Sequence, residues 1–304
     1  MPLRRTLLFL AGQPALRRWV ETSPATRSLA HRFVAGSTLE EAVEVCRKIR
    51  SEGISATLDY LGENVTSLEQ AVACRDTGLR MLKALNEADL EPNISIKLTQ
   101  YGLDLSPEAC EANVASLVEA AAKLGGFVRL DMESSRYTSQ TLEIVTHLHQ
   151  KHGACGTVIQ ACLRRSHSDI AALASAGIRV RLCKGAYLEP PSAAFETKPE
   201  VDAAYTALAQ TLLRSAQYPA IATHDENLIG HIRTYIAENN IDPASFEFQM
   251  LYGIRRDLQQ NLVADGFRLR LYVPFGEAWY PYFMRRLAER PANLLFLLRN
   301  IIRA

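Results

Sequence analysis

The 304-residue sequence has no excess of either charge: 34 Lys and Arg are balanced by 33 Asp and Glu, for a formal net charge of +1. This balance excludes a generally basic surface for nucleic acid. Long apolar runs are scarce, and near the N-terminus the longest extends only from Leu7 to Gly12. A membrane-spanning helix needs ~20 residues, and no convincing signal-peptide cleavage site follows. We interpret the run as part of an amphipathic helix packed on the body of a cytoplasmic protein, with peripheral contact to the inner face of the membrane as the alternative.

Several catalytic and ligand-binding motifs are also absent. The sequence contains no G-x-G-x-x-G, no G-x-x-x-x-G-K-[ST] and no G-x-S-x-G, so it lacks the Rossmann, P-loop and nucleophile-elbow signatures. His147, His149 and His152, with Cys155, resemble a metal site only superficially, and we expect exposed histidines and no bound metal. The six cysteines include no C-x-x-C pair, which favours buried free thiols over disulfides.

From Ile54 onward, short apolar runs rich in β-formers alternate with longer segments of helical period. Eight such runs recur at intervals of roughly 31 residues, close to one strand–helix unit. Nearly continuous apolar runs are typical of parallel strands buried on both faces, and a closed set of eight leaves no exposed edge. The pattern predicts an α/β fold of the (β/α)8 TIM-barrel type. The predicted strands are Ile54–Asp59, Ile94–Leu98, Phe127–Met132, Thr157–Gln160, Ile178–Cys183, Ala220–Thr223, Phe246–Met250 and Leu269–Val273.

The segments between these runs read as helices. Pro107–Leu124 is one example, with Ser106 as its N-cap and proline in its first turn. Residues 1–53 precede the first predicted strand, and Thr38–Ser51 within them has helical periodicity. We therefore expect an N-terminal helical arm over residues 1–53, followed by a catalytic barrel over residues 54–304.

Polar residues mark the predicted carboxyl ends of the strands, where barrel enzymes carry their chemistry. An ionisable group in an apolar strand costs several kcal/mol unless it is paired. A single ionisable residue of this kind would indicate a structural ion pair, but several at one end of the barrel predict an active or binding site there. They are Lys97, Asp131, Gln160, Arg181, Lys184, Thr223, His224, Gln249 and Tyr272.

The segment Trp279–Glu289 follows the last predicted strand. On a helix, Tyr282, Arg285 and Arg286 share one face. A guanidinium matches carboxylate or phosphate through two parallel hydrogen bonds, so the pair predicts a clamp for a small anion; a solvated charged face is the alternative. For a phosphate-bearing cofactor, the obvious cradle is the run from Arg181 through Lys184 and Gly185 to Ala186.

Taken together, these motifs resemble those of the proline dehydrogenase family, and more specifically its short monofunctional bacterial type. The resemblance extends in order from Ile54 to the C-terminus, and R-L-x-K-G-A-Y together with Y-x-x-R-R is highly specific. The segments that carry it are Ser95–Leu98, Arg129–Met132, Arg181–Tyr187, Ala222–His224, Glu247–Gly253 and Tyr282–Arg286.

The resemblance implies a distorted barrel that holds FAD non-covalently and oxidises L-proline to Δ1-pyrroline-5-carboxylate by hydride transfer from C5 to flavin N5. This is the first step of proline degradation to glutamate. Electrons would pass to a quinone at the membrane. The chain has no room for the family's second, aldehyde-oxidising domain, so the product would pass to a separate pyrroline-5-carboxylate dehydrogenase.

The resemblance also assigns roles to residues. Asp131 and Arg181 would be catalytic, with Arg181 near flavin N5, and Glu63 would pair with Arg285 as a gate. The residues implied to bind substrate are Lys97, Tyr187, Leu251, Tyr272, Tyr282, Arg285 and Arg286. Those implied to contact FAD are Met132, Gln160, Arg181, Lys184, Gly185, Ala186, Thr223 and His224.

Two positions refine this assignment. Relatives that prefer hydroxyproline tend to have a smaller residue at the position of Tyr282, so this tyrosine indicates proline. Asp225 departs from the asparagine that related chains often carry, and its charge either weakens the binding of FAD or faces solvent. The base that deprotonates the substrate nitrogen stays open between water and Asp131.

Two other functions are compatible with a barrel of this kind. The first is a Schiff-base lyase or aldolase that uses Lys97 or Lys184, both at predicted strand ends. The second is a non-catalytic flavin-binding or regulatory barrel. The colour of the purified protein, and its response to proline, separates these functions from the dehydrogenase.

Overall fold

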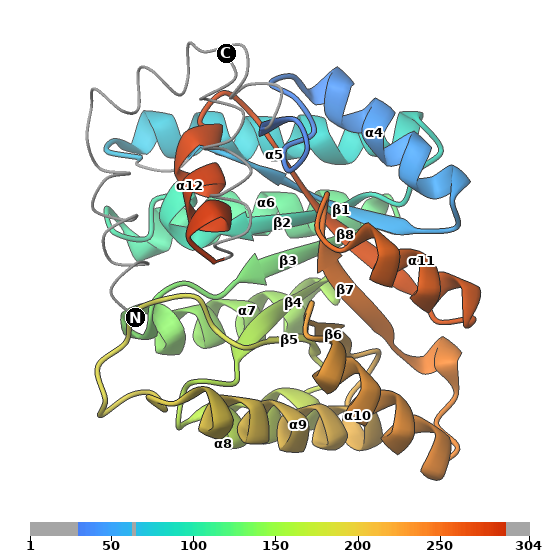
Figure 1. Ribbon diagram of the computed structural model, residues 1–304. Coiled ribbons are helices and arrows are strands. Elements are labelled where there is room, and N and C mark those ends of the chain that lie inside the picture. Colours follow the sequence, from blue (N-terminus) through green and yellow to red (C-terminus); the bar gives the residue numbers. More distant parts are fainter. Residues whose placement is uncertain (1–29, 63–64, 290–304) are drawn as a thin grey trace, which may run out of the picture.

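The computed structural model describes residues 30–62 and 65–289. Eight parallel strands follow one another around a closed barrel, and the eighth pairs with the first (Figure 1). All eight predicted strands are confirmed to within two residues at each end. They are β1 (Ser55–Tyr60), β2 (Asn93–Lys97), β3 (Phe127–Asp131), β4 (Cys155–Gln160), β5 (Arg179–Cys183), β6 (Ala220–Ala222), β7 (Glu247–Leu251) and β8 (Leu269–Phe275).

Helices follow the strands, and local capping explains where several of them begin. Ser106 accepts a hydrogen bond from the backbone of Ala109 and caps α6, as predicted. Thr197 forms a capping box with Glu200 at the start of α9. The helices after the strands are α5 (Leu68–Glu87), α6 (Pro107–Lys123), α7 (Thr138–His152), α8 (Ser166–Ser175), α9 (Lys198–Ser215), α10 (Glu226–Glu238), α11 (Arg256–Ala264) and α12 (Trp279–Glu289), with short 3-10 turns η1 (Leu98–Tyr101), η2 (Ser135–Tyr137) and η3 (Pro243–Ser245).

The last helix, α12, does not join the outer ring. It packs in a separate hydrophobic cluster with Phe33, Leu61 and Ile254, and the last two of these residues follow β1 and β7. It therefore lies over the carboxyl end of the barrel, while the place beside β1 and β8 is taken by α4 (Leu39–Ser51) (Figure 1). Cys46 of α4 is buried in the main core. This exchange of helices is the distortion of the barrel.

The strands are apolar toward the helices and polar toward the barrel axis. Leu58 and Leu130 are fully buried in the core that the strands share with the helices. Arg129, Glu247 and Arg270 are also buried, although Arg129 lies in the middle of β3 and the other two lie at the amino-terminal ends of their strands. Buried polar strand residues are therefore not confined to the carboxyl ends that the sequence analysis considered. They occupy the whole interior, which in many barrels is filled by branched apolar side chains.

The cysteines and histidines noted in the sequence make ordinary structural contacts. All six thiols are free, as predicted, and burial raises the pKa of Cys46 and Cys155 to about 12. Nδ1 of His149 lies 3.1 Å from the carbonyl oxygen of Cys155, and His147 contacts Glu111. Within residues 30–62 and 65–289, no group of three or more His, Cys, Asp or Glu side chains is arranged to hold a metal ion.

Two sequence predictions concern residues that the structure does not describe. The apolar run Leu7–Gly12 and the expected gate residue Glu63 both lie outside the described ranges. In the part of the chain that is described, none of the helices combines the length and the apolar character needed to cross a membrane.

Candidate active site at the carboxyl end of the barrel

Arg181 of β5 lies at the centre of the polar interior and is only 6% exposed. Its Nε donates to Oε1 of Gln249 at 2.5 Å, its Nη1 to Oδ1 of Asp131 at 2.7 Å, and its Nη2 to Oγ of Ser95 at 2.9 Å. These partners come from β7, β3 and β2. A guanidinium bonded through all three nitrogens has one orientation, so the fold holds a rigid cation on the barrel axis.

Asp131 accepts hydrogen bonds on both carboxylate oxygens. Arg181 occupies Oδ1, and the hydroxyl of Tyr272 donates to Oδ2 at 2.8 Å. Burial and the nearby carboxylates of Asp131 and Asp59 raise the pKa of Tyr272 well above its usual 10, so its hydroxyl stays protonated and remains a donor. The carboxylate is therefore held in place from two sides.

Lys97, at the end of β2, is paired with a carboxylate that the sequence analysis did not single out. Its Nζ lies 3.1 Å from both oxygens of Asp59 and 3.5 Å from the hydroxyl of Tyr272. Asp59 is 1% exposed. Burial raises the pKa of Asp59, and the charge of Lys97 opposes that rise. The available signal was an acidic residue at the end of the apolar run Ile54–Asp59.

The hydrogen bonds continue from Arg181 toward the opposite end of the barrel. Gln249 Nε2 donates to Glu247 at 2.5 Å, and Arg270 donates to Glu247 and Glu91, each at 2.9 Å. The amide of Gln249 thus bridges a cation and an anion. We call this continuous set of side chains the axial network: Glu91, Arg270, Glu247, Gln249, Arg181, Asp131, Tyr272, Lys97 and Asp59.

The predicted anion clamp lies on α12. Tyr282 is buried, and the guanidinium carbon of Arg286 lies 5.2 Å from the centre of its ring. Arg285 and Arg286 are partly buried. Because α12 covers the carboxyl end of the barrel, these two cations belong to the same end of the molecule as Lys97.

Lys184, after β5, is shared between two carboxylates. Its Nζ lies 2.6 Å from Oδ1 of Asp202 and 2.8 Å from Oδ2 of Asp225. Lys198 also contacts both carboxylates. Partial burial raises the pKa of Asp225, but the hydrogen bond and charge of Lys184, with Lys198, lower it overall to about 2. Asp225 therefore pairs with the predicted cofactor-binding lysine, and it also caps α10.

The neighbouring loops place further candidate residues at this end of the barrel. At Gly185 the backbone φ is +109°, and a Cβ would lie 2.3 Å from Sγ of Cys162, so only glycine fits. Nε2 of His224 accepts a hydrogen bond from the backbone N–H of Leu251 at 2.8 Å. A neutral His224 therefore carries its hydrogen on Nδ1.

The remaining predicted residues differ in exposure. Met132, Gln160 and Thr223 are buried beside the ends of β3, β4 and β6. Tyr187, by contrast, is 42% exposed in the loop that follows β5. The structure thus gathers the described candidate residues at one end of the barrel, where Tyr187 is exposed.

Comparison with known proteins adds an independent line of argument. The family model described as "Proline dehydrogenase" matches residues 42–299. Proline dehydrogenase 1 of Bacillus subtilis (strain 168) is 40% identical over 301 residues, which cover 99% of each chain. Proline dehydrogenase of Deinococcus radiodurans is 36% identical over 305 residues, covering 99% of this chain and 98% of that one.

A solved structure supports the same relationship at the level of the fold. Proline utilization A from Bdellovibrio bacteriovorus, crystallised after inactivation by N-propargylglycine, matches with a TM-score of 0.81 at 28% sequence identity. The match covers 87% of this chain and 33% of that larger chain. The similarity therefore concerns one part of a longer protein.

Proposed function

Because the chain belongs to the proline dehydrogenase family and is an oxidoreductase, we propose that it oxidises L-proline to Δ1-pyrroline-5-carboxylate with a non-covalently bound FAD. One observation carries the proposal. The rigid guanidinium of Arg181 lies on the barrel axis, below a helix that presents Arg285 and Arg286 at the same end. Arg181 would stabilise the negative charge that develops during the reaction, and Arg285 and Arg286 would bind the carboxylate of the substrate.

The donors at this end of the barrel fit a flavin. The described residues use three of the five N–H groups of Arg181. A bound flavin would supply the redox chemistry, as the acceptor of the hydride from the substrate. The residues that would hold the cofactor are Met132, Gln160, Arg181, Lys184, Gly185, Ala186, Thr223 and His224.

The substrate would be bound through its carboxylate and its ring. Arg285, Arg286 and Lys97 supply positive charge for the carboxylate, and Asp59 fixes the position of Lys97. Holding the substrate in one orientation contributes several kcal/mol to a reaction that depends on alignment. The ring would lie among Tyr187, Leu251, Tyr272 and Tyr282.

The substrate nitrogen must lose a proton before or during hydride transfer, and the geometry favours water as the base. Both oxygens of Asp131 already accept hydrogen bonds, from Arg181 and Tyr272. To take a proton, this carboxylate would have to give up one of them. In this proposal Asp131 orients Arg181 and Tyr272 and is not the base.

The lysine surroundings disfavour the aldolase alternative. Schiff-base formation requires a neutral amine. Lys97 lies beside Asp59, and Lys184 lies beside Asp202 and Asp225. Both lysine side chains are thus already bound to carboxylates, which a Schiff-base lysine would have to leave.

Three further parts of the proposal rest on the family relationship alone. The electron acceptor is a quinone, reached by peripheral contact with the cytoplasmic face of the membrane. The product is consumed by a separate pyrroline-5-carboxylate dehydrogenase. The family relationship also implies a gate formed by Arg285 and Glu63, the latter of which lies outside the described residues.

An absorbance spectrum under argon tests the proposal. The purified protein is expected to be yellow and to lose this colour when L-proline is added, while D-proline serves as the control. A yellow protein that does not respond to L-proline would favour the regulatory barrel. A colourless protein that borohydride links covalently to an aldehyde substrate would support the aldolase.

Replacing Asp225 by Asn is expected to strengthen FAD binding about two- to fivefold. The change removes a negative charge next to Lys184, and charges at partly exposed sites are worth about 0.5–1 kcal/mol. Asn caps helices as well as Asp, so α10 should be retained. Dissociation constants measured by flavin fluorescence test this expectation. Asp257→Asn, which changes an exposed carboxylate on α11, is the control, and unchanged or weaker FAD binding in Asp225→Asn contradicts the prediction.

Replacing Tyr282 by Ser is expected to raise kcat/KM for hydroxyproline relative to proline by about tenfold or more, because a change in pocket size is worth about 1–3 kcal/mol. Tyr282 is 5% exposed, so its loss will also destabilise α12. Tyr282→Phe keeps the ring and should leave the preference unchanged. A serine variant that still folds but keeps the original preference removes Tyr282 from the ring wall.

A further inference from the structure

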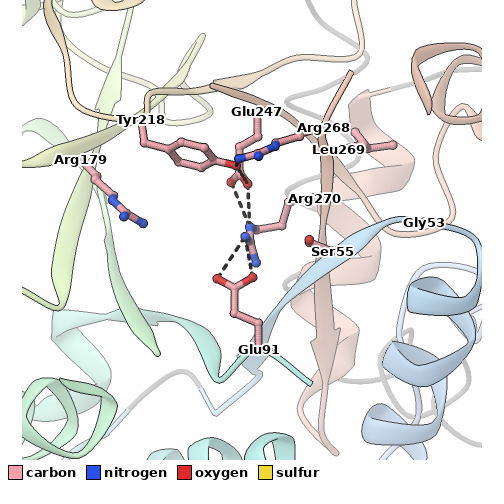
Figure 2. Close-up of a pocket in the computed structure, with 9 residues that line it drawn as sticks. All are labelled: Gly53, Ser55, Glu91, Arg179, Tyr218, Glu247, Arg268, Leu269 and Arg270. Carbon is pink, nitrogen blue, oxygen red and sulfur yellow. Dashed lines mark hydrogen bonds and ion pairs between the residues drawn. The ribbon is translucent and has the colours of Figure 1, made fainter. Parts of the chain in front are cut away.

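A second pocket lies at the opposite end of the barrel, formed where the strands begin. It has a volume of about 470 Å³, within the range of small-molecule sites. Figure 2 shows its lining: Gly53, Ser55, Glu91, Arg179, Tyr218, Glu247, Arg268, Leu269 and Arg270. None of these residues takes part in the reaction proposed above.

The carboxylates of this amino-end pocket already have a partner. Arg270 donates to Glu247 through Nε and to Glu91 through Nη2, each at 2.9 Å (Figure 2). Arg270 is 6% exposed and Glu247 is 3% exposed. The two acidic groups are therefore engaged within the wall, and their repulsion of an incoming anion is reduced.

Arg179 and Arg268 differ from Arg270 in their partners. Neither forms an ion pair with a carboxylate anywhere in the described ranges. Nη1 of Arg268 donates to the hydroxyl of Tyr218 at 3.4 Å. Asp242, which caps η3, and Glu247 act on Arg268 only as more distant charges. These two guanidiniums are the cations of the pocket that can accept an external anion.

Tyr218 separates the two guanidiniums. The guanidinium carbons of Arg179 and Arg268 lie 5.3 and 5.7 Å from the centre of its ring, and Figure 2 shows them on either side of it. The backbone of Tyr218 has φ +44°, a conformation that is uncommon for a bulky residue and must be held by its surroundings. The fold therefore maintains the ring between two cations at a cost in backbone strain.

Arg129 adds a further positive charge behind the pocket. Its Nη1 donates to the carbonyl oxygens of Arg179 at 2.7 Å and Thr157 at 3.1 Å, so its bonds are to neutral groups. Burial, with the nearby Arg181, lowers its pKa to about 9, and it stays charged near neutral pH. The amino end of the barrel thus contains four arginines against two glutamates, the buried Glu247 and the exposed Glu91.

We propose that the amino-end pocket binds a small organic dicarboxylate, with one carboxylate on Arg179 and the other on Arg268. Because the two guanidiniums are separated by the ring of Tyr218, a ligand that pairs with both needs two anionic groups. Each guanidinium can donate two parallel hydrogen bonds to one carboxylate. The pocket is larger than a single oxyanion needs, and Tyr218 and Leu269 supply apolar surface for a short carbon chain.

Calorimetric titration of the holoenzyme with succinate at constant ionic strength tests the proposal without measuring catalysis. Succinate is expected to bind the wild type and to bind Arg268→Gln about tenfold more weakly, since one charged pair is lost. The double variant Arg179→Gln/Arg268→Gln should lose binding. Arg233→Gln, an exposed arginine of α10, should bind as the wild type does, and thermal melting confirms that each variant is folded.

The catalytic end also carries arginines, so the site of binding must be assigned. Arg285→Met should bind succinate as the wild type does if the ligand occupies the amino-end pocket. Loss of binding in Arg285→Met, with binding retained in the double variant, overturns the proposal, as does the absence of binding to the wild type at millimolar succinate. Inorganic phosphate that binds as tightly as succinate would also contradict the assignment of two anionic groups.

Discussion

Replacing Arg181 by Met is expected to lower kcat for proline about 10²–10³-fold, with a much smaller change in KM. Removing one preorganised donor from developing negative charge typically costs about 2.7–4 kcal/mol in the transition state. Arg181 is suited to that task because Gln249, Asp131 and Ser95 fix its three nitrogens before substrate arrives. The rate of anaerobic bleaching by proline, measured by stopped flow at several proline concentrations, separates the two constants.

The same substitution also removes a partner from Asp131, which is mostly buried. Breaking a buried pair by removing one member destabilises a protein by about 3–5 kcal/mol, so bound flavin and melting temperature must be measured alongside the rate. Arg181→Lys is the informative companion, because it keeps the charge but lacks the rigid planar fork with which the guanidinium reaches its three partners. Turnover at the wild-type rate in flavin-loaded Arg181→Met would remove Arg181 from the catalytic role.

For Arg285, substitution by Met is expected to raise KM for proline about 30-fold or more and to leave the flavin content nearly unchanged. A charged partner for a desolvated carboxylate is worth about 2–5 kcal/mol, and Arg285 lies partly buried on the helix that covers the barrel mouth. Steady-state kinetics over a wide range of proline concentrations measures this effect.

The control for Arg285 is Arg233→Met, which removes an arginine paired with Asp265 on the outer surface. Its KM should equal that of the wild type. If Arg285→Met also retains the wild-type KM, the carboxylate is bound elsewhere, and Arg286 with Lys97 becomes the pair to examine.

The strands could be predicted from the sequence because each is a short apolar run between segments of helical period. The start of a helix could also be predicted where a single capping residue sets it, as Ser106 does for α6. Lys97, Asp131 and Tyr272 could be placed together because parallel strands bring their carboxyl ends to one rim. These features depend on periodicity or on neighbours along the chain.

Other features depend on contacts between distant segments, and the sequence could not reveal them. Nothing local distinguishes α12, which covers the mouth, from a helix of the ring, or shows that α4 takes the vacated place beside β1 and β8. Asp59 becomes notable only when Lys97, 38 residues later, lies against it. The arginines at the amino end were missed because a strand pattern does not show which charges will meet across the axis.

The axial network has a consequence for how such a barrel can change over time. In most barrel enzymes the amino-terminal end of the barrel, its base, serves stability, and the loops at the carboxyl end carry the catalytic residues and can change without it. Here Glu247 and Arg270, near the base, are joined through Gln249 to the guanidinium at the reaction centre. A new charge at the base therefore alters the electrostatic potential felt by the substrate, and the two faces of this enzyme must evolve together.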